Sequence, residues 1–360
     1  MTSFVTCAIL MLFVNIMFFA QGFARSTEGA SGLANMTKKH FARIGIILSG
    51  VFFILFQLYL PLGMEAAQVG HRGLQILYSA ILGVTVAILL VFCLIVAVKR
   101  DYIQGQWHTL LRFRHLLNLM VKRDFLTRYR RSVLGVLWSL LNPILTMLVL
   151  TMVFSFIFRF EIAYFPVYLL SGQLIFAFFS ESTSQAMGSV ISNAHIVKKV
   201  YVPKYIFPVS RVLSSCVNLA FSFVAFLLVI LVTGAPFHWT ILLVPIPLLY
   251  TFMFSLGIGM LLSSLAVFFR DLSYIYGIFI TLLTFLTPIF YPVSILPDRV
   301  FQLIHLNPIF HYVTFFRSLA LYGELPGLWV NIVCLGFALA ALCIGLYSTM
   351  KVQDRYILYL

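Results

Sequence analysis

The chain has 360 residues, of which 62% are hydrophobic and 9% are charged, and its mean hydropathy is +1.05. Soluble globular chains carry about a quarter charged residues and keep a polar exterior, so this composition excludes a soluble protein and indicates helices that cross a bilayer. The net charge of +14 does not indicate nucleic-acid binding, because the basic residues lie between apolar segments, where positive charge orients membrane proteins.

Apolar segments recur along the whole chain, and a bilayer core accepts helices of about 20 such residues. The segments long enough to span are 4–24, 44–63, 74–98, 133–158, 165–186, 206–233, 240–268, 274–291 and 327–349. The sequence therefore predicts an all-α polytopic membrane protein. We expect an N-terminal extension with three spans over 1–100, a cytoplasmic amphipathic helix over 101–132 and a six-span domain over 133–360.

Basic residues predict the orientation. Lysines and arginines far outnumber aspartates in 99–131, so we expect this stretch in the cytoplasm. Counting spans from there places 187–205 and the C-terminal tail inside, 292–326 outside, and the N-terminus outside. A cleaved signal peptide over 4–24 is the alternative, although no lysine or arginine precedes its apolar run.

The stretch before the six-span domain carries apolar residues at spacings of three and four. They are Trp107, Leu110, Phe113, Leu117, Val121 and Phe125. Arg114 shares their face, so the amphipathicity is moderate. We expect a helix on the membrane surface, anchored by the tryptophan, whose basic residues attract anionic lipid; a solvated linker is the alternative.

Charged residues inside predicted spans are few, and each costs roughly 2.5–3.5 kcal/mol to insert. Glu181 lies within the second span of the six and Arg211 near the start of the third. A pair between them is one hypothesis. A structural carboxylate at Glu181 and an Arg211 side chain that reaches the inner headgroups are the alternatives.

The stretch 292–326 is too apolar for a loop in water, and prolines interrupt it. Prolines break helices, so we expect short helices that enter the outer leaflet without crossing it. A membrane tolerates such non-spanning backbone when it is buried in protein or lines a cavity. Arg317 falls in the second of these helices. The stretch is typical of a lid over a passage.

Sites of catalysis and metal binding are not evident in the sequence. It contains no G-x-x-x-x-G-K-[ST], H-E-x-x-H or C-x-x-C motif. His305 and His311 are six residues apart and do not share a helix face, so we expect no metal there. We expect no catalytic residue and no cofactor in this chain.

Five motifs resemble the membrane subunit of ABC-2 type exporters of cell-surface polysaccharides, in the order and spacing of that family. They are RYRRSVLGVLWSLLNP (128–143), SNAHIVKKVYVP (192–203), VFFRDL (267–272), TPIFYP (287–292) and NPI (307–309). The resemblance covers about residues 107–355. The three N-terminal spans are not part of the family pattern, and nothing in their residues indicates a function.

The resemblance implies a six-span core with an amphipathic interface helix and outer re-entrant gate helices. It implies a homodimer that pairs with two copies of a separate ABC ATPase, which binds ATP and Mg. It also implies export of a lipid-linked glycan, such as O-antigen, capsule or teichoic acid, across the bacterial inner membrane.

The family pattern assigns roles to particular residues. ATPase coupling falls on Asn193, His195, Lys198, Lys199, Arg270 and Asp271. The interface helix includes Trp107, Arg123, Arg128, Arg130 and Arg131. The translocation path or gate includes Glu181, Arg211, Tyr291 and Arg317.

Two other functions remain open. A small-molecule efflux permease of the same superfamily would share the architecture, but the motifs favour a glycan exporter. A polytopic transferase acting on lipid-linked sugars needs paired acidic or histidine residues in loops, and the loops here hold isolated carboxylates.

Overall fold

A computed structural model describes residues 83, 105, 108–129, 134–154, 162–200, 202–352 and 356. The predicted spans 4–24 and 44–63, nearly all of 74–98, and the predicted interface residues Trp107, Arg130 and Arg131 lie outside these residues.

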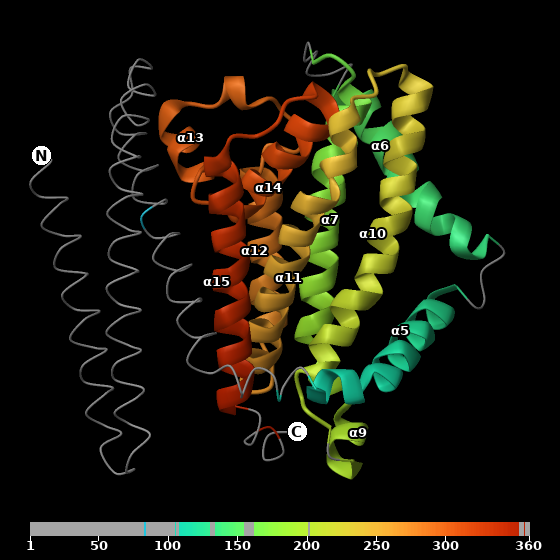
Figure 1. The fold of residues 1–360 in the computed structure, drawn as a ribbon, viewed down its shortest axis with the longest axis vertical. Helices are drawn as coiled ribbons and strands as arrows, with labels where there is room; N and C mark the ends of the chain where they lie inside the picture. The colour runs from blue at the N-terminus through green and yellow to red at the C-terminus, as the bar shows by residue number, and fades with distance from the viewer. Residues whose placement is uncertain are drawn as a thin grey trace, which may run out of the picture. The chain divides into compact units, whose positions relative to one another are not determined.

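The described part of the chain is helical and contains no strand. Its long helices are α5 (Arg114–Tyr129), α6 (Trp138–Val153), α7 (Phe165–Met187), α10 (Ile206–Thr233), α11 (Pro245–Ala266), α12 (Leu272–Leu286) and α15 (Leu328–Val352). Its short elements are η2 (Gly135–Leu137), α8 (Ser189–Ser192), α9 (Ala194–Lys199), η4 (Trp239–Leu243), η5 (Val293–Ile295), α13 (Asp298–Ile304), α14 (Pro308–Arg317) and η6 (Ser318–Tyr322). Figure 1 shows α7, α10, α11, α12 and α15 upright, whereas α5 lies obliquely to them.

Among the described residues, four helical stretches are long and apolar enough to cross a membrane, and they match four predicted spans. They are Gly135–Val153, Ile206–Thr233, Trp239–Ala266 and Trp329–Val352. The helix α7 also agrees with its predicted bounds, and its 23 residues reach about 34 Å at 1.5 Å per residue. It is not among the four because its second half is polar.

The predicted span 274–291 is wrong in length. The helix α12 has 15 residues and ends at Leu286, so it reaches about 22 Å, less than the roughly 30 Å of a bilayer core. The cause is Pro288, because a proline disfavours helical backbone in the residue before it. Thr287 accordingly adopts an extended conformation, with φ −85° and ψ 127°.

Two opposite ends of the bundle carry the short helices. In Figure 1 α5 and α9 lie at the lower end, and α13 lies toward the upper end. Thr240 of η4 donates to the carbonyl of Leu319 in η6 at 2.5 Å, which joins the α10–α11 connection to the segment after α14. We call the end that carries α5 and α9 the α5 end, and the opposite end the α14 end.

The core lies around α7 and at a close crossing of α11 and α15. A buried apolar cluster joins α7, α10, α11, α14 and α15. Gly257 faces the backbone of Ala341 and Gly345 so closely that no Cβ fits there, which brings the two helices together as small residues do in membranes.

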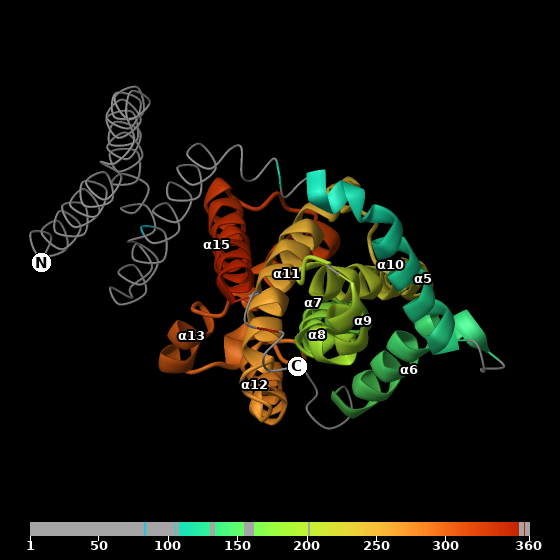
Figure 2. The same cartoon turned by 90° about the horizontal axis from the view of Figure 1, so that it is seen from below.

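Two helices lie at the periphery, and Figure 2 shows α6 and α12 at the rim of the helix group. Their outward side chains are large and apolar, among them Met152 at 65% exposure and Ile278 at 73%. Lipid tails or an apolar protein surface would suit these faces, because neither needs polar partners.

Candidate functional site

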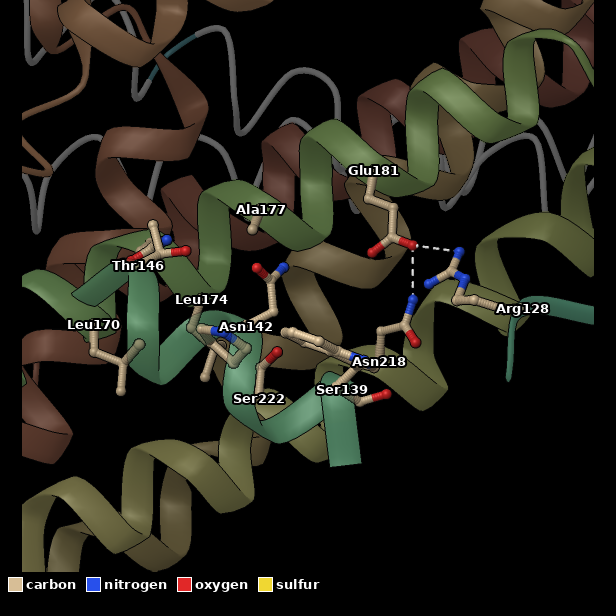
Figure 3. Close-up of a pocket in the computed structure, with 13 residues that line it drawn as sticks. Arg128, Ser139, Asn142, Thr146, Leu170, Leu174, Ala177, Glu181, Asn218 and Ser222 are labelled. Carbon is tan, nitrogen blue, oxygen red and sulfur yellow. Dashed lines mark hydrogen bonds and ion pairs between the residues drawn. The ribbon is translucent and has the colours of Figure 1, made fainter. Parts of the chain in front are cut away.

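A cavity of about 470 Å³ lies among α6, α7 and α10. It is lined by Arg128, Trp138, Ser139, Asn142, Pro143, Thr146, Leu170, Gln173, Leu174, Ala177, Glu181, Asn218 and Ser222. Figure 3 shows these side chains coming from the three helices and, for Arg128, from α5. Eight of the 13 lining residues are polar or charged, although α6 and α10 are highly apolar helices.

Helical periodicity places these residues on one face of each helix. On α7 the lining positions 170, 173, 174, 177 and 181 recur every three or four residues, which is one side of a helix. On α6 the positions 139, 142 and 146 do the same, and on α10 Asn218 and Ser222 are four apart. Leu170 and Glu181 are 11 residues apart on α7, so the cavity follows this helix for about 16 Å.

Glu181 is the centre of a polar cluster at one end of the cavity (Figure 3). Its Oε1 atom lies 2.8 Å from Nη2 of Arg128 and accepts hydrogen bonds from Asn218 at 2.7 Å and Gln185 at 2.8 Å. The predicted pair between Glu181 and Arg211 is therefore wrong. Arg211 precedes Asn218 by seven residues, about 10 Å along α10, and lies too close to the α5 end.

Arg211 pairs instead with Asp124 of α5, with Nη1 2.8 Å from Oδ2. Phe125 stacks beside this pair on Phe221 of α10, with ring centroids 6.3 Å apart. Arg123 contacts the same aspartate at 3.3 Å from a more exposed position. An ion pair and a ring contact thus attach α5, the predicted interface helix, to α10, the third of the six core spans.

The helix α5 buries part of its predicted apolar face. Leu117 is buried, and Leu110 and Phe113 pack against the same cluster. Arg114 is exposed, and a turn at Phe113 interrupts the helix. Met120 is also buried, so the buried face is rotated slightly from the predicted one.

The predicted ATPase-coupling residues divide into one buried and five exposed positions. Asn193 is buried and donates to the carbonyl of Ser189 at 2.8 Å, which joins α8 to α9. The exposed residues are His195, Lys198, Lys199, Arg270 and Asp271. Ser189 and Ser263 are 3.4 Å apart, so the α8–α9 segment and the α11–α12 turn lie at the same end of the bundle.

The predicted gate residue Arg317 is buried at 4% exposure. Its guanidinium donates to the carbonyls of Pro288 at 2.8 Å and Ile289 at 3.2 Å. Tyr291 follows these residues, and its carbonyl accepts from the hydroxyl of Tyr168 at 3.0 Å. Arg317 and Tyr168 therefore hold the non-helical turn after α12 against α7 and α14.

The two histidines of the α14 end bond to backbone. His311 contacts the carbonyl of His305 through Nε2 at 2.8 Å, and His305 contacts the carbonyl of Phe301 through Nδ1 at 2.7 Å. Within the described residues no three His, Cys, Asp or Glu side chains come together as a metal site would need.

Several residues of the cavity could not be assigned from the sequence. Asn142, Gln173 and Asn218 are single polar residues within apolar runs. Only Gln173 shares a helix with Glu181, and its spacing of eight residues, about two turns, was the available signal that the two side chains share a face.

Comparison with known proteins relates this chain to a family of transporters. The family described as "ABC-2 type transporter" matches residues 115–321. The chain is 28% identical to the O-antigen export system permease protein RfbA of Klebsiella pneumoniae over 248 residues, which cover 68% of this chain and 95% of that protein. It is 32% identical to RfbA of Myxococcus xanthus over 219 residues, covering 60% and 84%. It is 25% identical to the polysialic acid transport protein KpsM of Escherichia coli over 237 residues, covering 62% and 88%.

Proposed function

Because the chain belongs to the ABC-2 type transporter family, we propose that it is the membrane subunit of an ATP-driven exporter of a lipid-linked cell-surface polysaccharide. The substrate class comes from the relatives that export O-antigen and polysialic acid. The chain spans most of the length of these relatives.

The observation that carries this proposal is the polar cavity beside Glu181. Polar and ionised groups at membrane depth are costly, and they are retained where they face a pathway or a partner. Here amides and hydroxyls gather on facing sides of α6, α7 and α10, beside the ion pair between Glu181 of α7 and Arg128 of α5. A passage for a hydroxyl-rich substrate needs such a surface.

A separate ATPase supplies the energy in this proposal, since the sequence has no phosphate-binding loop of its own. Two copies of that ATPase bind ATP and Mg and dock on a homodimer of this chain. The exposed cations Lys198 and Lys199 of α9 and the Arg270-Asp271 turn form the docking surface. Closure of the ATPases then moves the helices as rigid bodies.

The basic interface helix and the gate also determine the proposed orientation of the chain in the membrane. The α5 end, with its basic interface helix, faces the cytoplasm, and the α14 end faces outward as the gate. Tyr291 and Arg317 lie in that gate, and Glu181 lies along the path. Six membrane passages, with α7 and the short α12 among them, and an external N-terminus complete the proposed topology.

Co-expression with the ABC ATPase encoded beside this gene tests the proposal. We expect the two proteins to purify together, to hydrolyse ATP, and to restore surface glycan in cells that lack the permease. Failure to associate would exclude the exporter assignment. ATPase stimulation by small amphipathic compounds without glycan export would favour a small-molecule permease instead.

The docking surface has a matched test. Lys198→Glu combined with Lys199→Glu should reduce co-purification of the ATPase at least tenfold, because α9 loses its positive surface. Lys122→Glu combined with Lys351→Glu changes the charge by the same amount at exposed positions of α5 and α15 and should reduce it less. Equal loss in both pairs would refute docking on α9.

A further inference from the structure

We infer that the cavity among α6, α7 and α10 is a binding site for a neutral saccharide within a single subunit. The saccharide class rests on the proposed function, and the site itself rests on the lining residues. Nine of the 13 lining residues carry side-chain amides, hydroxyls, one carboxylate, one guanidinium or one indole, and the other four, Pro143, Leu170, Leu174 and Ala177, are apolar.

An unsatisfied acceptor in the cavity wall indicates a ligand that donates hydrogen bonds. The Oε1 atom of Gln173 is buried, and no group of the described chain donates to it. A buried acceptor without a donor is costly, and native proteins rarely keep one without a partner. Gln173 lies on the cavity face of α7, so a donor bound in the cavity would satisfy it.

The charge balance of the cavity favours an uncharged ligand. Its two charged residues are Arg128 and Glu181, which pair with each other at 2.8 Å. A phosphate beside Arg128 would meet a guanidinium whose charge is already offset, and it would lie close to the like charge of the Glu181 carboxylate. Glu181 already receives donors from Asn218 and Gln185, so the guanidinium is held by a fixed partner.

Saccharide hydroxyls match the remaining groups better than a lipid tail does. Each hydroxyl both donates and accepts, and side-chain amides and hydroxyls at Asn142, Thr146 and Ser222 face the cavity (Figure 3). Trp138 offers an apolar ring for the C–H face of a sugar. An alkyl chain in the same space would leave these polar groups without hydrogen bonds.

A fluorescence titration of the full chain, in complex with its ATPase in lipid nanodiscs, tests this site. The probes are mannobiose, maltose and diacetylchitobiose, with inorganic pyrophosphate as the anionic comparison. The signal is the Trp emission that disappears in Trp138→Phe. We expect saturation by at least one disaccharide and a weaker response to pyrophosphate.

Variants locate the binding. Gln173→Leu and Asn142→Leu should each weaken disaccharide binding at least tenfold and slow glycan export. Asn331→Leu makes the same change on α15, outside the cavity, and should leave the affinity unchanged. Because the two leucine variants are on different helices, one of them still tests the site if the other misfolds.

Two results would overturn the site. One is a wild-type complex that saturates with no disaccharide, and the other is tighter binding of pyrophosphate than of any sugar. Failure of the proposed function is distinguishable, because it appears as a wild-type chain that neither binds its ATPase nor exports glycan. Normal export by both leucine variants would reject the site and leave the exporter assignment intact.

Discussion

The guanidinium of Arg317 lies over the aromatic ring of Tyr168, with Cζ 3.5 Å from the ring centroid. The same group donates through Nε to the hydroxyl of Ser171 at 3.1 Å and through Nη2 to the carbonyl of Tyr168 at 3.1 Å. With its bonds to Pro288 and Ile289, one side chain joins α14, α7 and the turn after α12. A buried cation without a carboxylate partner among the described residues is thus stabilised by carbonyls and a ring.

Replacing this cation should destabilise the protein. Arg317→Met keeps much of the side-chain volume and leaves the carbonyls of Pro288 and Ile289 with fewer donors. Since each unsatisfied buried group costs about 1–3 kcal/mol, we expect a loss of at least ~2 kcal/mol of unfolding free energy. Unfolding of the purified chain in mixed detergent micelles measures it.

Arg270→Met is the matched control, because Arg270 is exposed in the α11–α12 turn. Surface substitutions of this kind change stability by about 0.5 kcal/mol or less. If both variants were equally stable, the carbonyl contacts of Arg317 would contribute nothing to the fold.

The pair between Asp124 and Arg211 predicts energetic coupling between α5 and α10. Both side chains are mostly buried, at 10% and 22% exposure. We expect Asp124→Asn and Arg211→Gln to be non-additive, with a coupling of about 0.5–3 kcal/mol, which is typical of contacting residues. A double-mutant cycle on unfolding free energy gives this value.

Arg123 provides the internal comparison. Its side chain is 46% exposed and contacts Asp124 at 3.3 Å, and exposed pairs contribute about 1 kcal/mol or less. We expect the cycle between Arg123→Gln and Asp124→Asn to give the smaller coupling. A larger coupling of Asp124 with Arg123 than with Arg211 would mean that α5 is held to the bundle by other contacts.

Much of the fold could be predicted because the bilayer imposes a simple length rule. The bounds predicted for 206–233 coincide with α10 and those for 165–186 with α7 to within one residue. The rule failed at α12, where apolar residues continue past Leu286 but Pro288 ends the helix. Hydropathy records the apolar character of a segment, and it does not record the conformation of its backbone.

The partners of the charged residues were less predictable. Composition identified Glu181 and Arg211 as costly groups, and both are paired in the structure. Their true partners, Arg128 and Asp124, are on α5. A sequence gives the depth of a residue on its own helix, but the pairing depends on how α5 lies across α7 and α10.

Acid should destabilise the α14 end through its two buried histidines, which lie outside the spanning helices. Burial lowers the pKa of His311 to about 4 and also lowers the pKa of His305. In the unfolded chain a histidine has a pKa of about 6.5. Between pH 6.5 and 4 the unfolded state therefore binds more protons, and stability falls as the pH falls.

Thermal unfolding from pH 7.5 to 5 measures this effect. We expect the melting temperature to decrease toward pH 5, and His311→Gln to decrease less over the same range, because an amide does not titrate. His195→Asn, at an exposed position of α9, should keep the slope of the wild-type chain. A slope unchanged by His311→Gln would assign the acid sensitivity to other groups.

The crossing of α11 and α15 should tolerate no side chain at Gly257. A Cβ there would overlap the backbone of Ala341, and backbone cannot move aside as a flexible side chain can. Gly257→Ala should therefore force the helices apart, with overpacking costs of about 1–3 kcal/mol or more, and lower the monodisperse fraction in size-exclusion chromatography. Gly277 of α12 has open space around its Cα, so Gly277→Ala should be neutral or stabilising, since alanine favours helix over glycine by about 1 kcal/mol. Equal behaviour of the two variants would mean that α11 and α15 do not approach as closely as Gly257 and Gly345 allow.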